Sequence, residues 1–315
     1  MRWGSMLAGV ALPPPCHVPI EAPLPIARWM ADVLRCGRTP HVWTYASSAT
    51  RLCRAAAEAG LNLRGARFSV SGEPATPARL AVVRQAGAEI VPRYGASDCG
   101  QIGFGCLAPV VADEVHWLSD LHALIQPLDA EASPRLPDTL LLMSSLRPTA
   151  RQILLNASLG DQAIVLSRDC GCPFERLGWT LHAHTIRSDE KVTAAGMNFS
   201  DAELIRVLDE VLPGRFGGTP THYQLVEDEG PHGQPRLRLL VHPLVGSLDD
   251  RLVADTFLDA ISRGSGVERV MGLAWRGAGV LHVERRPPMS TATGKILHLH
   301  VDRRTPGRAV RLSAV

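Results

Sequence analysis

The sequence is poor in aromatic residues and lacks an excess of either charge. Phe, Trp and Tyr make up 5% of the 315 residues, and 33 Lys and Arg face 31 Asp and Glu, which gives a formal net charge of +2. No run of five like charges occurs. A nucleic-acid surface needs a basic stripe, and single-strand binding also needs aromatic stacking platforms. These absences argue against nucleic acid as the main partner.

Long apolar runs are absent as well. No stretch reaches the roughly 18 residues that a membrane helix needs, so we expect no membrane partner. The stretch from Trp3 to Leu12 is mildly apolar, but three prolines follow it and no small-x-small cleavage site is clear, so we expect no signal peptide. Seven cysteines, an odd number, do not form a disulfide framework in a chain of this size. A reducing, cytoplasmic environment fits this cysteine usage.

The apolar content of 45% is enough to bury a full core, and the length suggests about two domains. Helical and strand patterns alternate in the α/β manner over the first part of the chain. We expect helices at residues 25–34, 48–59 and 77–86 and buried strands at 67–70 and 88–91. Ser47 or Ser48 is a plausible cap of the second helix, and Gly60 its stop. The last strand delivers Tyr94 to a loop at a strand's carboxyl end, where open α/β sheets bind ligands.

The pattern then changes to short strands and later to a small α+β unit. Strands are expected at residues 116–125, 139–144, 152–156 and 163–167, which indicates a β-rich subdomain. Further on we expect helices at 201–211, capped by Ser200, and at 249–262, and strands at 221–226, 236–241 and 280–285. The boundary falls near Ser188, so we predict domains 1–187 and 188–315. The polar residues 128–131 are interpreted as a surface loop inside the first domain.

Two glycine-containing motifs suggest nucleotide chemistry. Tyr94, Gly95, Ser97 and Asp98 place a hydroxyl and a carboxylate on a glycine turn, which can meet a phosphate and its magnesium. Near the C-terminus Lys295 follows Gly294, and a lysine from a second domain can neutralise charge that develops on an oxygen. Each motif alone has a structural interpretation too, since Gly, Ser and Asp are common in capped turns and most lysines are solvated.

The ordered set of motifs resembles the adenylate-forming (acyl-CoA synthetase) superfamily, in particular its phenylacetate-CoA ligase-like branch. Residues 71–74 (Ser-Gly-Glu-Pro) resemble the adenine-side turn, 94–98 the aromatic-Gly-x-Thr-Glu motif, and 159–161 the ribose-binding aspartate motif. Residues 186–191 and 196–199 resemble the Gly-Arg-x-Asp-Asp hinge. The resemblance covers about residues 8–302. Two positions depart from the family pattern, because Asp98 replaces a glutamate and Ile186 stands where a glycine is expected.

The resemblance implies a role for each matching residue. Ser71, Gly72, Glu73, Tyr94, Gly95, Ser97, Asp161 and Arg187 would bind the nucleotide, Lys295 and Asp98 would be catalytic, and the hinge would lie at Asp189. Asp98 would help to hold Mg²⁺, and Lys295 would assist adenylation. Carboxylates suit a ribose because one can accept from both hydroxyls. Asp161 could equally belong to a turn that starts a strand, and Arg187 to a surface salt bridge.

A second constellation has the composition of a metal site. Cys170 and Cys172 supply two thiolates at a Cys-x-Cys spacing, and Cys106 with His116 could bring a thiolate and an imidazole, which together satisfy tetrahedral zinc. Some phenylacetate-ligase-like sequences carry a similar arrangement. Cys99 is a substitute ligand. The alternative is that these cysteines are small buried hydrophobes.

Two histidine pairs recur at i, i+2, namely His182 with His184 and His298 with His300. Both members of a pair on a strand point to one face, so each pair could bind a metal or relay a proton. The solvated face of an edge strand explains the spacing as well.

The sequence therefore predicts an α/β fold, the C-terminal part of an adenylate-forming large domain followed by a small α+β domain. The function implied by the resemblance is that of an AMP-forming ligase, which joins an aryl or arylacetate carboxylate to CoA with ATP. ATP/AMP, Mg²⁺, CoA as co-substrate and structural Zn²⁺ would be the ligands. The family's Gly-, Ser- and Thr-rich phosphate loop is not found in the chain, so the alternative is a non-catalytic nucleotide-binding remnant or subunit. A homodimer or a partner chain that supplies the loop is left open.

Overall fold

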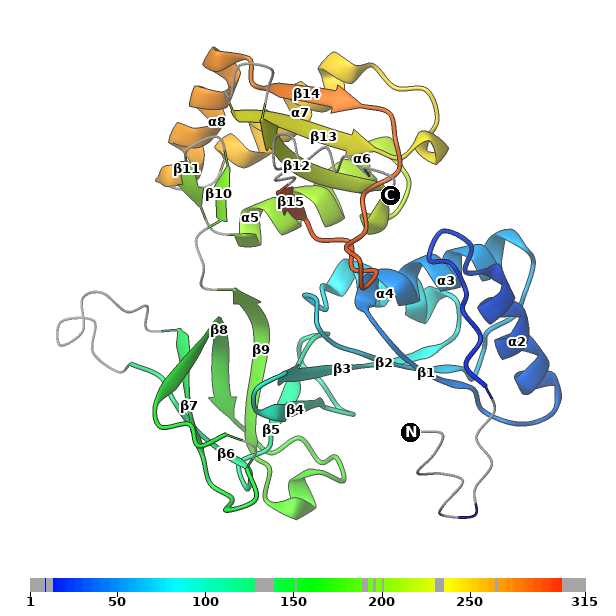
Figure 1. The fold of residues 1–315 in the computed structure, drawn as a ribbon, viewed down its shortest axis with the longest axis vertical. Coiled ribbons are helices and arrows are strands. Elements are labelled where there is room, and N and C mark those ends of the chain that lie inside the picture. The colour runs from blue at the N-terminus through cyan, green and yellow to red at the C-terminus, as the bar shows by residue number, and fades with distance from the viewer. Residues whose placement is uncertain are drawn as a thin grey trace, which may run out of the picture.

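The computed structural model describes residues 9, 14–127, 139–150, 152–188, 192–194, 197–199, 201–229, 235–263 and 266–301. Two sheets organise this part of the chain (Figure 1). We call residues 14–188 the first lobe and residues 192–301 the second lobe, within these described ranges. The predicted loop at 128–131 and the predicted helix cap Ser200 lie outside the described residues. The described residues contain no helix that is both long and apolar enough to cross a membrane.

The first lobe is built on a nine-stranded sheet of order β1-β2-β3-β4-β5-β9-β8-β7-β6. β1–β2 and β2–β3 are parallel pairs, and every later pair is antiparallel. Its strands are β1 (His41–Thr44), β2 (Arg67–Val70), β3 (Glu89–Ala96), β4 (Gly100–Gly105), β5 (Val115–Trp117), β6 (His122–Ile125), β7 (Leu140–Ser145), β8 (Ala157–Ser167) and β9 (Leu181–Ser188), with a short 3₁₀ turn η1 (Glu175–Leu177) before β9. The sheet therefore joins a parallel α/β part to an antiparallel β-rich part, as the sequence predicts.

Three helices accompany the parallel strands: α2 (Leu24–Arg35), α3 (Ala46–Glu58) and α4 (Pro77–Gln85). α3 forms where the sequence predicts it, because Ala49, Leu52, Cys53 and Ala56 recur at helical spacing and are buried. The predicted serine cap is wrong. The N-cap position belongs to Tyr45, which provides no side-chain cap. Instead, the Glu73 carboxylate reaches the helix N-terminus from outside and accepts a 2.8 Å hydrogen bond from the Ser47 N–H.

Three predictions for the first lobe are corrected. Residues 152–156 form no strand, since Asn156 adopts a left-handed φ of 46° and β8 begins after it. The segment 116–125 divides into β5 and β6, because a turn after Trp117 lets its indole donate to the His122 carbonyl at 2.8 Å. Tyr94 lies in β3 instead of a loop, because β4, which was not predicted, pairs with it through Gly103.

The second lobe packs helices against a four-stranded sheet of order β14-β13-β12-β15 (Figure 1). A hairpin of β10 (Val192–Ala194) and β11 (Met197–Phe199) precedes it. The other elements are α5 (Asp201–Arg206), the π-helical turn η2 (Val207–Val211), α6 (Leu212–Phe216), η3 (Pro220–His222), β12 (Tyr223–Glu229), β13 (Pro235–Val241), η4 (Pro243–Val245), α7 (Asp250–Ser262), α8 (Val267–Ala278), β14 (Leu281–Glu284) and β15 (Leu299–Val301).

The core of the second lobe is apolar and includes Leu204, Leu208, Phe257 and Trp275, each at most 2% exposed. The predicted helix at 201–211 is confirmed as helical, although its second half is π-helical, and α8 was not predicted.

The segment between β14 and β15 leaves this lobe and lies against α3 and α4 of the first lobe, as Figure 1 shows. That crossing segment brings Lys295 to the first lobe.

Candidate functional site

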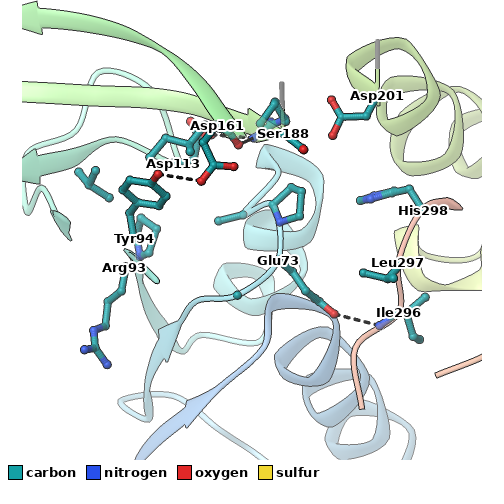
Figure 2. A pocket seen from close by; sticks show the side chains of 18 of the residues that line it. Glu73, Arg93, Tyr94, Asp113, Asp161, Ser188, Asp201, Ile296, Leu297 and His298 are labelled. Carbon is teal, nitrogen blue, oxygen red and sulfur yellow. Dashed lines mark hydrogen bonds and ion pairs between the residues drawn. The ribbon is translucent and has the colours of Figure 1, made fainter. Parts of the chain in front are cut away.

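A pocket of about 390 Å³ lies between the two lobes (Figure 2). Its first-lobe wall comes from the loop after β2, from β3, from the start of β5, from Asp161 within β8 and from the end of β9. Its second-lobe wall comes from α5 and from residues 296–299. Six of the eight predicted nucleotide-binding residues line it: Gly72, Glu73, Tyr94, Gly95, Asp161 and Arg187.

Tyr94 and Asp161, which both line this pocket, are hydrogen-bonded to each other. The Tyr94 hydroxyl donates to Asp161 Oδ2 at 2.7 Å across 67 positions of sequence. Burial raises the pKa of Tyr94, and the Asp161 charge raises it further, so the phenol stays protonated and continues to donate. Asp161 lies within β8, directly after Gly160, whose φ is +76°. The bond fixes a carboxylate at the pocket wall.

Several buried polar atoms around the pocket have no hydrogen-bond partner among the described residues. They are Asp113 Oδ1, Arg187 Nε and Asp201 Oδ1. Arg187 Nη1 forms an ion pair of 3.5 Å with Asp113. Asp201 faces the first lobe from the start of α5, and burial raises its pKa to about 6. Unpaired buried donors and acceptors are costly, so this lining suits a ligand with several hydrogen-bonding groups.

Glu73 joins the pocket to the crossing segment. Its carboxylate is fully buried and accepts hydrogen bonds from the Ser47 hydroxyl at 2.8 Å and from the Ile296 N–H at 2.9 Å. We call residues 290–296 the lysine loop. Within it the Thr291 N–H donates to the Lys295 carbonyl at 2.9 Å, and the Lys295 N–H donates to the Thr291 hydroxyl at 3.0 Å. The lysine loop is therefore a closed turn that Glu73 fastens to the first lobe.

Gly294 is required by the shape of this turn. Its φ is +93°, and a Cβ at this position would lie 1.9 Å from Ile20 Cδ1. The neighbouring Lys295 ammonium is 5.2 Å from the centre of the Tyr45 ring. It would also lie 3.5 Å from a Cβ on Gly72. Lys295 is thus next to the pocket loop but is not among the residues that line the pocket.

Four buried side chains from both lobes form what we call the interlobe ion cluster: Thr76, Arg79, Asp209 and His298. The Thr76 hydroxyl donates to Asp209 Oδ2 at 2.6 Å, and Arg79 Nε lies 3.3 Å from the same oxygen. His298 Nε2 lies 3.0 Å from Asp209 Oδ1 and 2.9 Å from Arg79 Nη2. The Arg79 and Asp209 side chains are each 1% exposed. This buried ion pair between Arg79 and Asp209 connects α4 of the first lobe to η2 of the second lobe.

Burial and neighbouring charges shift the pKa values of Asp209 and His298 in this cluster. Burial raises the pKa of Asp209, but His298, Arg79 and hydrogen bonds together outweigh burial and leave this pKa below its ordinary value. Burial and the Arg79 charge lower the pKa of His298. The cluster was not predicted. The interpretation of His298 as part of a solvated edge is wrong, since it is 7% exposed.

Besides Lys295, three predicted residues lie away from the pocket lining. Ser97 and Asp98 belong to the exposed hairpin turn between β3 and β4, and Ser71 precedes the pocket loop. The predicted hinge residue Asp189 lies outside the described residues. The turn interpretation of Ser97 and Asp98 thus agrees with the structure of this segment.

The four predicted metal ligands are brought together from three segments. One ligand atom each from Cys106, His116, Cys170 and Cys172 lies within 4.8 Å of the others, and Cys99 is not part of the group. His116 Nδ1 lies 2.6 Å from the Trp179 carbonyl, which can only accept, so Nδ1 carries the proton. His116 Nε2, 3.1 Å from Cys172 Sγ, then keeps its lone pair. This tautomer suits a metal ligand, and the four-atom set fits tetrahedral zinc.

A charged layer supports these thiols. Glu114 accepts from Arg168 Nε at 2.8 Å and lies 2.5 Å from His182 Nδ1. His182 is fully buried, so a solvated edge does not explain it either. Burial raises the pKa of Cys172, but hydrogen bonds from backbone N–H groups and from the Cys170 side chain outweigh burial and lower it to about 7. A thiolate is therefore accessible near neutral pH.

Comparisons with known proteins find similarity at the level of structure. No protein-family model matches the sequence, and no curated protein matches it either. A 2-hydroxyisobutyryl-CoA ligase, crystallised in the postadenylation state with R3-HIB-AMP, aligns over 96% of this chain and 62% of its own, at 17% identity and a TM-score of 0.59. An anthranilate CoA ligase in complex with anthranoyl-AMP aligns over 91% of this chain and 52% of its own, at 12% identity and a TM-score of 0.53.

These comparisons identify the fold. The described chain has the architecture of the C-terminal part of an adenylate-forming ligase, with a large α/β sheet followed by a smaller α+β unit. The chain spans less than two thirds of the length of these two neighbours. The predicted fold class is confirmed.

Proposed function

We propose that this chain carries the adenosine-binding side and the catalytic lysine loop of an AMP-forming acyl-CoA ligase. Such an enzyme joins a carboxylate to AMP at the expense of ATP, releases pyrophosphate, and transfers the acyl group to CoA. The observation that carries the proposal is the interlobe pocket, in which the fixed Tyr94–Asp161 pair shares the lining with residues 296–299, the segment that begins at the last residue of the lysine loop. The fold supports the same conclusion.

Each side chain receives a role from its chemistry. Asp161 accepts hydrogen bonds from ribose hydroxyls, since a carboxylate has two acceptor oxygens. Arg187, with an unpartnered buried Nε, donates to ribose or phosphate oxygens. Lys295 stabilises negative charge that develops as the carboxylate attacks the α-phosphate. Mg²⁺ would neutralise the phosphates, with Asp98 as its ligand from the hairpin turn.

We propose an aryl or arylacetate acid as the substrate. The phenylacetate-ligase-like motif order supports this class, and one structural neighbour was crystallised with anthranoyl-AMP. The neighbours extend beyond the region that this chain matches, so the complete reaction is proposed for the chain together with whatever supplies the phosphate grip. We further propose a domain boundary near Ser188 and a hinge at Asp189, since β9 ends there and the second sheet follows.

We also propose a structural zinc ion at Cys106, His116, Cys170 and Cys172. The supporting observations are the convergence of the four ligand atoms and the His116 tautomer. A closed thiolate and imidazole site stabilises the fold that surrounds it. Here the ion would connect the residue that follows β4, strand β5 and the segment before η1.

A non-catalytic nucleotide-binding subunit is the second candidate function. The exposed placement of Ser97 and Asp98, outside the pocket lining, favours it. A subunit of this kind would bind AMP but would form no thioester. A partner chain would then supply the missing phosphate contacts.

Two measurements test the proposal. Calorimetry should detect AMP binding, and Asp161→Asn should weaken it about 10- to 100-fold, the equivalent of about 1.5–3 kcal/mol for a charged hydrogen bond. Asp120→Asn, an exposed aspartate that pairs with Arg147, is the matched control and should bind AMP normally. Thioester formation from synthetic anthranoyl-adenylate and CoA then distinguishes the ligase from the subunit. A folded chain that does not bind AMP would contradict both functions.

A further inference from the structure

A second cavity, of about 550 Å³, lies between the lobes and is lined by basic side chains. Its charged lining residues are Glu21, Arg51, Arg54 and Arg286. Among the described lining residues, Ile296 is the only one that this basic cavity shares with the candidate nucleotide pocket. The basic cavity is therefore a separate compartment beside the lysine loop.

Arg51 carries a charge that no described carboxylate pairs with. Its guanidinium donates to three neutral acceptors, the Ser48 hydroxyl at 3.2 Å, the Ser290 hydroxyl at 3.4 Å and the Gly294 carbonyl at 3.0 Å. Its Nε is buried and has no acceptor among the described residues. Arginine remains charged even where burial lowers its pKa. The charges of Glu73 and Glu21 oppose that lowering, but neither carboxylate forms a direct ion pair with Arg51 in the described chain.

The other two arginines are only weakly neutralised. Arg54 Nε lies 3.3 Å from Glu58, whose side chain is 60% exposed, and Arg54 Nη1 contacts His222 Nε2. Arg286 lies 3.5 Å from Glu284 and is itself 46% exposed. Ion pairs in such exposed positions are screened by solvent and contribute little. Three guanidinium groups thus share one cavity with a single lining carboxylate, Glu21.

We propose that the basic cavity binds a phosphate-bearing anion. Guanidinium groups bind phosphate oxygens through paired N–H donors, and several of them around one cavity match the high charge of a diphosphate better than that of a single carboxylate. Inorganic pyrophosphate and a phosphate group of CoA share this chemistry. The volume of about 550 Å³ accommodates a ligand larger than a single phosphate.

An anion bound in this cavity would affect the lysine loop through Arg51, which contacts both. Arg51 donates to Ser290 and to Gly294, the residue before Lys295. An anion that binds Arg51 therefore competes with these contacts or fixes them, and so changes the mobility of the loop. This coupling to Lys295 depends on the proposed function, whereas the anion site itself does not.

Calorimetry with sodium pyrophosphate at low ionic strength tests the site in the full chain. Arg286→Gln should weaken pyrophosphate binding about 3- to 10-fold, and Arg51→Met about 10- to 100-fold, which follows from about 1.4 kcal/mol per factor of ten and the value of charged hydrogen bonds. Arg276→Gln is the matched control, since Arg276 on α8 is 43% exposed and lies outside the cavity lining. Arg286→Gln keeps the test valid if Arg51→Met does not fold.

Competition identifies the source of the phosphate. Displacement of pyrophosphate by CoA but not by dephospho-CoA would assign the cavity to the 3′-phosphate of CoA, and displacement by neither would assign it to free pyrophosphate. Absence of saturable pyrophosphate binding, or equal weakening by Arg276→Gln and Arg286→Gln, would overturn the site. Binding should persist with saturating AMP. Pyrophosphate binding by a chain that fails to bind AMP would leave this site intact and refute only the proposed function.

Discussion

Replacing Asp209 by asparagine should uncouple the two lobes. The change keeps the shape of the side chain and removes the charge that faces Arg79 at 3.3 Å and His298 at 3.0 Å. Breaking a buried ion pair by removing one partner costs about 3–5 kcal/mol, because the remaining charge stays buried and uncompensated. Glu73 still pairs with Arg79 at 3.2 Å, so we expect a loss near the lower end of that range.

Urea unfolding measures this loss. Trp275 is buried in the second lobe and Trp117 in the first, so separate single-tryptophan reporters can follow each lobe. The matched control is Asp259→Asn, whose carboxylate also pairs with an arginine, Arg276, but is 56% exposed and should therefore cost less than about 1 kcal/mol. Equal losses for Asp209→Asn and Asp259→Asn would refute the reasoning, because the larger cost is expected only for the buried Asp209, which also bonds to Thr76 and His298.

The remaining predictions concern zinc, the lysine loop and pH. Purified chain should contain one zinc ion by elemental analysis, and Cys172→Ala should lose the metal and lower the melting temperature, whereas the exposed Cys36→Ala should do neither. Lys295→Ala should leave thioester formation from a synthetic acyl-adenylate nearly unchanged and abolish adenylation wherever adenylation is measurable; equal loss of both would contradict its assignment to the first half-reaction. Gly294→Ala should reduce stability by more than about 1 kcal/mol, because it combines a left-handed φ with a clash against Ile20, and thermal unfolding measures the loss. Stability should fall as the pH drops below about 6.5, because burial lowers the pKa of His222 to about 3 and also lowers the pKa of His298. In that window the unfolded chain binds protons that the folded chain does not, and His222→Gln should flatten the pH dependence in urea titrations.

Local patterns predicted the elements that depend on local chemistry. The helix at 48–59 follows from its apolar spacing. The helix predicted at 249–262 forms from residue 250, after an Asp249 cap whose side chain accepts from the Arg251 and Leu252 N–H groups. The cap of α3 could not be predicted, because its carboxylate comes from Glu73, 26 positions downstream of Ser47. Strand β4 was missed because three glycines weaken its strand pattern.

The candidate site was predictable where motifs carry it. Cys106, His116, Cys170 and Cys172 converge as the residue types suggest, and Tyr94 and Asp161 meet in the pocket. The interlobe ion cluster was not predictable, since its partners lie up to 219 positions apart. A partial signal does exist. Asp209 follows Ile205 by one helical turn and so falls on the apolar face, where an acid must have a partner.

The burial of the interlobe ion cluster determines how the lobes can separate. Arg79 and Asp209 of this cluster, and Glu73, which pairs with Arg79, each have side chains at most 1% exposed, so water cannot reach one of these charges until it can reach the others. A partly opened interface would leave charges without either a partner or hydration, and such a state is costly. The lobes should therefore exchange between two discrete arrangements, without a continuum of intermediate angles. In the NMR spectrum of the full chain, the indole of Trp275 would then give two separate resonances in slow exchange, instead of one averaged resonance.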